Sequence, residues 1–179
     1  MPCSEVQLAR SLMGILESQL VGADFVALLR DPHSRLADIL PRLDMYFLYS
    51  LVWSVGAVTD GAGRRTFSEH LRKATQVVHS LEHERLLKLE RSSQIPDGGQ
   101  SVHEYYVDGS RWACWRDKLR TVAPRDLLSG PSPASSSLQT FVPTTESLKI
   151  ARLLQLCLAH RLPVLLVGPT GTGKSASVQ

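Results

Sequence analysis

Residues 163–179 read PVLLVGPTGTGKSASVQ, and this stretch carries the most specific chemistry in the chain. Residues 168–175 match the phosphate-loop pattern G-x-x-x-x-G-K-[ST] in full. The glycines of such a loop allow a tight backbone turn whose N–H groups face phosphate oxygens. The pattern therefore predicts a nucleotide-binding loop of eight residues: Gly168, Pro169, Thr170, Gly171, Thr172, Gly173, Lys174 and Ser175.

The flanking residues fit the same interpretation. Lys174 is a compact charge that can reach the β- and γ-phosphates, and the hydroxyl of Ser175 is placed to ligate Mg²⁺. The run at 164–167 is wholly apolar, which predicts a short buried parallel strand leading into the loop. The residues after Lys174 would open a helix whose N-terminal end faces the same anion.

The site begins in this sequence without being completed. Only four residues follow Ser175. The acidic strand end that helps to hold Mg²⁺ normally comes later in the chain, and no apolar run before the loop ends in Asp-Asp or Asp-Glu. We therefore assign no catalytic residue, and we expect the 179-residue chain by itself not to hydrolyse nucleotide.

Composition and charge narrow the class of protein. A chain of 179 residues with 43% hydrophobic content can form one domain or two small ones. The net charge of +3 is mild, and basic residues alternate with acidic ones along the expected helices, which argues against a nucleic-acid-binding surface.

The cysteines and the longest apolar run indicate a soluble intracellular protein. Cys3, Cys114 and Cys157 are widely spaced, which is typical of reduced thiols in the cytosol. The start of the chain lacks the features of a signal peptide. The apolar run at 45–58 is too short and too interrupted to span a bilayer, so no membrane partner is expected.

Helical periodicity dominates the first 90 residues. Ser4 and Gln7 form a capping box, and an apolar stripe follows at helical spacing: Val6, Ala9, Met13, Leu16 and Leu20. Apolar spacing resumes at Leu36, with a break or kink expected at Pro41. Residues 45–56 are apolar nearly all round, which predicts the buried central helix of a bundle.

A further helix is expected after a turn at 59–63, capped by Thr66 or Ser68. Its apolar stripe consists of Phe67, Leu71, Ala74, Val78 and Leu81. His79 and His83 stand four residues apart on it, which is metal-ligand spacing, although their charged neighbours favour a solvated face.

The second half of the chain is more varied. Residues 103–107 have β-propensity and precede an Asp108-Gly109 turn, with Trp112 and Trp115 expected to pack a small hairpin or extended arm on the helices. A Ser- and Pro-rich linker follows. A helix is then expected from a cap near Thr144, with one apolar face made of Leu148, Ala151, Leu154 and Leu158.

Several stretches together resemble the dynein heavy chains, which carry six AAA+ modules in one polypeptide. The first is YFLYSLVWSVG at 46–56 with FSEHLR at 67–72. The second is YYVD at 105–108 with the pair Trp112 and Trp115. The third is FVPTT at 141–145 leading to VGPTGTGKS at 167–175. In spelling, the phosphate loop is more similar to axonemal than to cytoplasmic members.

The resemblance implies a fold class that is mainly α, with a small β excursion. Residues 1–128 would be the helical C-terminal subdomain of the second AAA+ module, with a β arm near 95–116. Residues 129–140 would be a linker. Residues 141–179 would be the start of the third, α/β module, with its first helix, its strand and its phosphate loop.

The resemblance also implies a function for the parent protein. The parent would be an ATP-driven, minus-end-directed microtubule motor of cilia or flagella, with ATP and Mg²⁺ bound at the complete module. Its partners would be neighbouring AAA+ modules, microtubules and other dynein chains, in the cytoplasm and the axoneme. An alternative is a non-catalytic helical interaction module that binds no nucleotide by itself.

Overall fold

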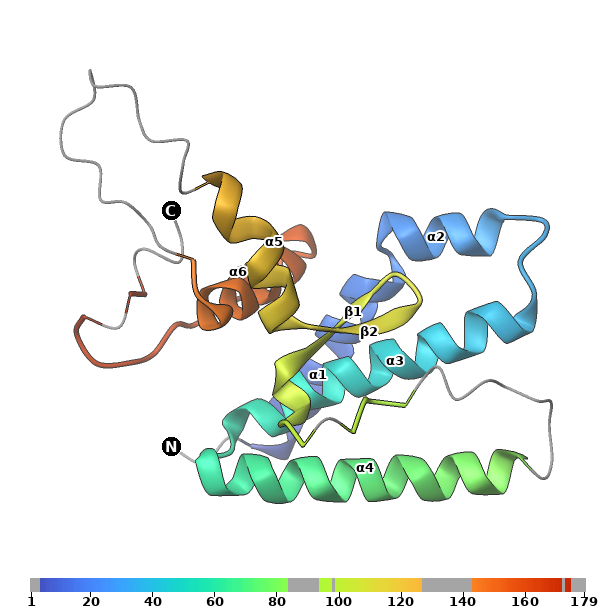
Figure 1. Ribbon diagram of the computed structural model, residues 1–179, viewed down its shortest axis with the longest axis horizontal. Helices are drawn as coiled ribbons and strands as arrows, with labels where there is room; N and C mark the ends of the chain where they lie inside the picture. Colours follow the sequence, from blue (N-terminus) through green and yellow to red (C-terminus); the bar gives the residue numbers. More distant parts are fainter. Residues whose placement is uncertain (1–3, 84–93, 98, 127–142, 172, 175–179) are drawn as a thin grey trace. The chain divides into compact units, whose positions relative to one another are not determined.

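The computed structural model describes residues 4–83, 94–97, 99–126, 143–171 and 173–174. The chain divides into two compact units, Met1–Ala113 and Cys114–Gln179. In the described part of the first unit, four helices precede a two-stranded sheet (Figure 1): α1 (Glu5–Leu20), α2 (Ala23–Arg30), α3 (Leu36–Ser54), α4 (Gly61–His83), β1 (Tyr105–Asp108) and β2 (Arg111–Cys114). The second unit contains α5 (Trp115–Asp126) and α6 (Thr145–Ala159). The mainly helical class with a small β element is confirmed.

Helix α1 begins where its capping box predicts, because the Ser4 hydroxyl accepts from the Gln7 backbone N–H and the Gln7 side chain accepts in return. The expected apolar face is right only at Leu16 and Leu20, which are half-buried. Val6 and Met13 are about 60% exposed, and Ala9 is exposed as well. The buried side of α1 consists instead of Gly14, Ile15, Ser18 and Gln19.

Small and polar residues form this buried side because α1 packs closely against α3. Gly14 and the compact Ser18 allow two helices to approach. The Gln19 amide nitrogen donates to Ser50 Oγ at 2.9 Å and to the Tyr46 carbonyl at 3.2 Å. The buried amide of Gln19 is therefore hydrogen-bonded, as burial of a polar group requires.

Helix α3 continues through Pro41, so of the break or kink expected there the break is wrong, and the kink stays a prediction. Proline removes one hydrogen bond near the N-terminal end, and the remaining helix is long and well packed. The buried central helix predicted at 45–56 is confirmed up to Ser54: Met45, Tyr49 and Val52 are at most 2% exposed. The ring of Tyr46 meets that of Phe25 from α2 edge to face, with centroids 5.6 Å apart.

Helix α4 begins earlier than the sequence predicts. Its first turn is capped by Asp60, whose carboxylate accepts from the Gly63 N–H at 2.7 Å, rather than by Thr66 or Ser68. Leu71 and Ser68 are buried, but Ala74 is exposed and so lies outside the core. The side chains of Val78 and Leu81 lie outside the described residues.

A short 3₁₀ turn at Gly56–Val58 joins α3 to α4 and needs its glycine. A Cβ at Gly56 would lie 2.6 Å from Phe67 Cε1 and 3.1 Å from His103 Nε2. Since real Cβ atoms essentially never come within 3.0 Å of such a neighbour, any larger residue would push these rings apart. The close approach brings α3, α4 and the segment before the hairpin together.

The hairpin follows the predicted turn. Strands β1 and β2 are joined by two residues, and Gly109 has a φ of +58°, which glycine adopts without strain. Residues 102–104 form a short 3₁₀ turn rather than the start of the strand. Trp112 lies in β2, whereas Trp115, expected in the hairpin or arm, begins α5 and is fully buried.

Helix α6 confirms its predicted start. Thr144 caps it, because its hydroxyl accepts from the Ser147 N–H at 3.1 Å while Ser147 Oγ accepts from the Thr144 N–H. The expected apolar face is only half right: Leu148 and Leu154 are half-buried, whereas Ala151 and Leu158 are exposed. The predicted linker at 129–140 lies outside the described residues.

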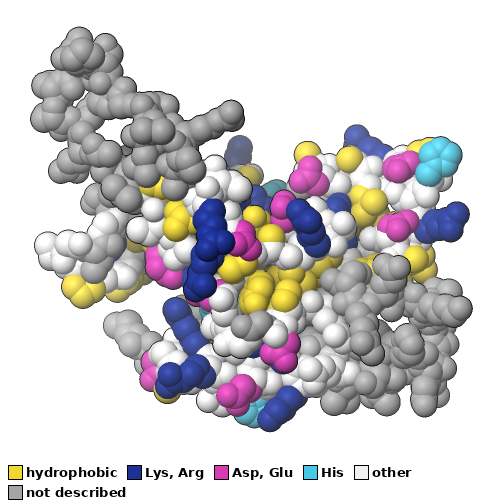
Figure 2. All heavy atoms as spheres, viewed as in Figure 1, with side chains coloured by type: hydrophobic (Ala, Val, Ile, Leu, Met, Phe, Trp, Pro, Cys, Tyr) yellow, Lys and Arg dark blue, Asp and Glu magenta, His cyan; other side chains and the backbone are white. Residues whose placement is uncertain are grey.

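On the face drawn in Figure 2, Lys and Arg side chains are interspersed with Asp and Glu side chains. No single helix of the described chain is long and apolar enough to cross a membrane. Helices α1 and α2 pass such a test only as a pair, and they are bent by 57° relative to each other.

Candidate phosphate-binding loop

The end of α6 sets the direction in which the chain enters the candidate loop. The Leu162 N–H donates to the Cys157 carbonyl at 2.8 Å, and the Arg161 N–H donates to the Leu158 carbonyl at 3.2 Å. These two bonds make a Schellman motif, which requires a left-handed residue directly after the cap. Arg161 occupies that position with a φ of +55°, where glycine is the usual residue.

The residues after this turn do not form the predicted strand. Residues 164–167 have no regular secondary structure, and Leu165 and Val167 are 85% and 83% exposed. The prediction of a buried strand is therefore wrong for this chain. A strand is stabilised by hydrogen bonds to a neighbouring strand, and the sheet described in this chain contains only β1 and β2.

The loop itself turns at the glycines that the sequence singled out. Gly171 and Gly173 have φ values of +84° and +76°, so both adopt the left-handed conformation that glycine tolerates. Gly168, Pro169 and Thr170 are exposed. The tight backbone turn expected of a phosphate loop is thus present around Gly171.

Lys174 folds back over the loop. Its ammonium donates to the Gly168 carbonyl at 2.8 Å and to the Pro169 carbonyl at 2.6 Å. The structure therefore brings the predicted lysine together with the first two residues of the pattern. Thr172 and Ser175 lie outside the described residues, as does the predicted helix opening, so the hydroxyl expected to ligate Mg²⁺ has no described position.

Metal binding would need a cluster of ligand side chains in the described part of the chain. In that part of the chain, no group of three or more His, Cys, Asp or Glu side chains is arranged to hold a metal ion. The side chains of His79 and His83 lie outside it. Neither Cys114 nor Cys157 forms a disulfide within the described residues, and partial burial raises the pKa of the Cys157 thiol.

Sequence reasoning missed a polar cluster that ties α4 to the chain before the hairpin. Arg72 Nη2 donates to the carbonyls of Pro96 and Gln100, at 3.0 and 2.7 Å. Its Nε lies 3.9 Å from the Asp97 carboxylate, which is 78% exposed and so weakly paired. Because the acceptors of Arg72 are backbone carbonyls, which every residue has, the sequence contains no residue type that would predict this contact.

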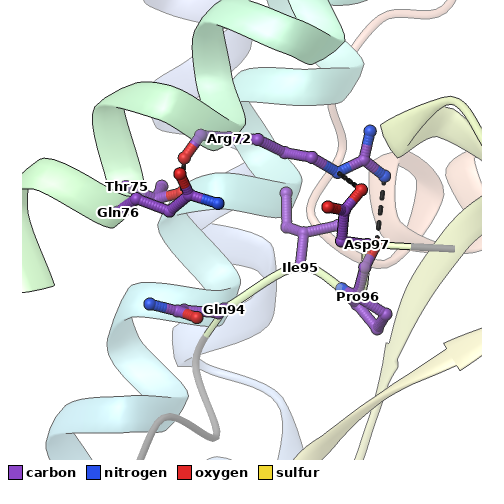
Figure 3. Close-up of a pocket in the computed structure, with 7 residues that line it drawn as sticks. All are labelled: Arg72, Thr75, Gln76, Gln94, Ile95, Pro96 and Asp97. Atoms are coloured by element: carbon purple, nitrogen blue, oxygen red, sulfur yellow. Dashed lines mark hydrogen bonds and ion pairs between the residues drawn. The ribbon is translucent and has the colours of Figure 1, made fainter. Parts of the chain in front are cut away.

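The same cluster borders a cavity of about 250 Å³ (Figure 3). The guanidinium of Arg72 points toward Asp97 and Pro96 at one end. The cavity is lined by polar and apolar side chains: Arg72, Thr75, Gln76, Gln94, Ile95, Pro96 and Asp97. Since Arg72 is engaged by two carbonyls, its first role here is to hold the segment 94–100 against α4.

A second cluster lies one turn earlier on α4. Ser68 Oγ lies 3.2 Å from Ser101 Oγ, and Ser101 Oγ lies 2.9 Å from His103 Nδ1. His103 is 2% exposed, and its ring meets that of Trp53 edge to face at 5.6 Å. The buried ring of His103, hydrogen-bonded to the half-buried Ser101, packs the junction between α3 and α4. A Ser-x-His spacing in the sequence could have indicated the pair, but not its burial.

Two family models match this chain. The model described as "Dynein heavy chain AAA lid domain" matches residues 1–117. The model described as "P-loop containing dynein motor region" matches residues 131–179. Together with the helical unit and the glycine turn at Lys174, they define the class: an AAA lid followed by the phosphate-loop segment of a motor region.

The chain belongs to the dynein heavy chain family. It is 29% identical over 150 residues to human "Dynein axonemal heavy chain 1", which covers 82% of this chain. It is 31% identical to rat "Dynein axonemal heavy chain 12", in a match that covers 74% of this chain. It is 27% identical to human "Dynein axonemal heavy chain 3", in a match that covers 97% of this chain. The chain spans only 3–4% of the length of these relatives.

Proposed function

We propose that this chain forms the junction between the second and third AAA+ modules of an axonemal-type dynein heavy chain. In this proposal residues 1–128 are the lid of one module, residues 129–140 are the linker, and residues 141–179 open the next module. The observation that carries it is the order of the two family matches, lid at 1–117 and phosphate-loop region at 131–179.

The loop at 168–175 binds the phosphates of ATP when the rest of the module is present. Gly168, Gly171 and Gly173 supply the turn. Their backbone N–H groups, together with that of Thr170, face the phosphates. Lys174 neutralises charge on the β- and γ-phosphates. Ser175 ligates Mg²⁺, which offsets the remaining phosphate charge. The positive φ values of Gly171 and Gly173 support this assignment.

The parent protein acts as an ATP-driven, minus-end-directed microtubule motor of the axoneme, in cilia or flagella and on the cytoplasmic side. Relatives named as axonemal dynein heavy chains support this assignment. Its partners are neighbouring AAA+ modules of the same chain, microtubules and other dynein chains.

The test is Lys174→Ala in a heavy chain that contains the complete module. Removing a hydrogen bond to a charged phosphate costs about 1.5–3 kcal/mol, so nucleotide affinity at that module should fall roughly tenfold or more. Lys73→Ala, at an exposed position on α4, is the matched control and should leave affinity unchanged. Unchanged affinity in the Lys174→Ala protein would refute the assignment.

A second candidate is a helical interaction module that binds no nucleotide by itself. The exposure of Leu165 and Val167 favours it for the 179-residue chain in isolation, because the strand that supports a phosphate loop is not formed. Both proposals predict little binding by the isolated chain, so they are distinguished by nucleotide affinity in a heavy chain that contains the complete module.

A further inference from the structure

The side of α1 opposite its contact with α3 carries an apolar stripe with heptad spacing. Its residues follow one another at alternating steps of three and four positions: Val6, Ala9, Met13, Leu16 and Leu20. The first three are exposed, Val6 by 62% and Met13 by 61%, and the last two are half-buried. Alternating steps of three and four define positions a and d of a coiled coil, the seam along which one helix packs on another. The stripe therefore has the pattern of a helix-pairing surface.

Two charged residues flank this stripe on one side. In the same heptad, Arg10 and Glu17 both occupy position e, and both are exposed. Charges at the positions beside the seam set the partner helix and its orientation. From residue 9 onward, the g positions on the other side hold Leu12, which is half-buried, and Gln19, which is buried against α3. Along this part of the helix, only the e side of the seam is open to ion pairs with another helix.

The apolar stripe is complementary to itself when two α1 helices run in opposite directions. With a twofold axis between residues 14 and 15, Met13 of each copy packs on Leu16 of the other, and Ala9 packs on Leu20. Position a of one helix thus meets position d of the other in each layer, as an antiparallel seam requires. The small side chain of Ala9 leaves room for the larger Leu20 that faces it.

The flanking charges select this alignment. Arg10 of one copy then lies two residues, about 3 Å along the helix axis, from Glu17 of the other, and the twofold axis repeats the pair. Sliding the helices by one heptad brings Arg10 against Arg10 instead. A parallel pair keeps an ion pair between Arg10 and Glu5, but it places the carboxylate of Glu17 against the apolar Leu12. Only the antiparallel alignment pairs both e residues with opposite charges.

We propose that the apolar face of α1 is a self-association surface, on which a second copy of this chain docks its own α1 in antiparallel orientation. The contact is isologous, so it closes as a dimer and does not propagate. Four seam residues from each copy make a small interface, so we expect a transient dimer with a dissociation constant on the order of 10–100 µM. No residue of the phosphate loop takes part, so the dimer does not depend on the proposed ATP site.

The first test is sedimentation equilibrium of the 179-residue chain from about 1 to about 200 µM, a range that spans the expected dissociation constant. Met13→Lys places an ammonium group from each copy in the middle of the seam, so this variant should stay monomeric throughout. Leu29→Lys is the matched control, because Leu29 is 53% exposed on α2 and lies outside the stripe. The control should dimerise as the unaltered chain does, and circular dichroism should show equal helix content in all three proteins.

A charge exchange tests the antiparallel alignment. Arg10→Glu sets a carboxylate opposite Glu17, and Glu17→Arg sets a guanidinium opposite Arg10, so each change alone should weaken the dimer about tenfold. The double variant Arg10→Glu/Glu17→Arg restores opposite charges at both pairs, and its affinity should return to within about twofold of the original. In a parallel pair the double variant would set two carboxylates together at Glu5 and would not recover.

Three results would overturn the proposal. The first is a chain that stays monomeric over the whole concentration range. The second is a dimer that survives Met13→Lys, and the third is a double variant that does not recover. Vesicles of phosphatidylserine and phosphatidylcholine provide a further comparison. If the monomeric chain binds them and Met13→Lys abolishes that binding, the face contacts lipid, and self-association is rejected.

Discussion

The helical unit and the phosphate-loop region differ in how far along the chain their polar contacts reach. In Met1–Ala113, Gln19 bonds Ser50 across 31 positions, Ser68 meets Ser101 across 33, and Arg72 bonds Gln100 across 28. After α6, the bonds that shape the loop join Lys174 to Gly168 and Pro169, six and five positions away. The first region is organised by distant parts of itself, and the second by its immediate neighbours.

The comparison shows which part of the structure depends on a larger context. Long-range contacts fix the helical unit because both partners of each contact lie within it. A strand such as the one expected at 164–167 needs partners that belong to a wider parallel sheet. The four predictions that follow test this division, from the largest expected effect to the smallest.

The largest effect concerns nucleotide binding by the isolated 179-residue chain. Ordering eight loop residues costs about 1–2 kcal/mol each when no sheet preorganises them. At the lower value the eight residues together cost about 8 kcal/mol. Even half of that total corresponds to roughly a thousandfold loss of affinity relative to the complete module. Titration with a fluorescent ATP analogue should therefore give weak or no binding, and phosphate release should not exceed background. If the isolated chain instead bound the analogue with micromolar affinity, and Lys174→Ala abolished that binding, the loop would not depend on a wider sheet. The two regions would then not differ in their need for a larger context.

The next effect is on the free energy of unfolding of the helical unit. Arg72→Met keeps the apolar stem of the side chain but removes both hydrogen bonds to the carbonyls of Pro96 and Gln100. We expect a loss of about 2–3 kcal/mol, measured by urea unfolding followed through tryptophan fluorescence. Lys73→Met, at the exposed neighbouring position, should change stability by less than about 0.5 kcal/mol. Equal effects of the two substitutions would show that the Arg72 contacts contribute nothing.

A smaller effect is expected at the C-terminal end of α6. Arg161 has a left-handed backbone, which costs an L-residue about 1–2 kcal/mol. Arg161→Gly relieves this strain but gains freedom in the unfolded chain, so the net stabilisation should be about 0.5–1 kcal/mol. Amide hydrogen exchange in the last turn of α6 should slow accordingly. Arg161→Val should accelerate the same exchange, and a result in the reverse order would exclude the Schellman turn.

The smallest effect concerns the thiol of Cys157. Burial raises its pKa, so at pH 8 the folded chain contains less Cys157 thiolate than the unfolded chain does. In a Cys3→Ser/Cys114→Ser protein, iodoacetamide should therefore react more slowly under native conditions than in urea. The ratio of the two rates should approach one as the pH rises through the pKa of the folded thiol. A ratio that does not depend on pH would indicate that access, and not ionisation, controls the reaction.

Local signals in the sequence predicted local structure well. The capping pairs Ser4/Gln7 and Thr144/Ser147 begin α1 and α6 because both partners of each cap lie three residues apart. The Asp108-Gly109 turn closes the hairpin for the same reason. Gly171 and Gly173 of the phosphate loop also adopt positive φ, a conformation that glycine reaches without strain.

Structure that depends on a distant partner could not be predicted in the same way. On α1, the apolar stripe through Val6 and Met13 has the expected spacing, but the surface that meets α3 contains Ser18 and Gln19. The partner of Gln19 lies 31 positions away, and those of Arg72 are backbone carbonyls. The apolar run at 164–167 has strand character in sequence, yet pairing is a property of a whole sheet.

The hydrogen bonds of Gln19 also fix how α1 is aligned lengthwise on α3. Its amide nitrogen reaches both Ser50 Oγ and the Tyr46 carbonyl, which belong to successive turns of α3. Sliding one helix along the other by a single turn moves it about 5.4 Å, beyond the reach of either bond. The amide would then keep only its bond to the Ile15 carbonyl of its own helix and would lose both bonds to α3, each of which contributes about 0.5–1.5 kcal/mol. The contact therefore selects one lengthwise alignment of α1 on α3. With an apolar residue at position 19, nothing in this contact would prevent one helix from sliding along the other.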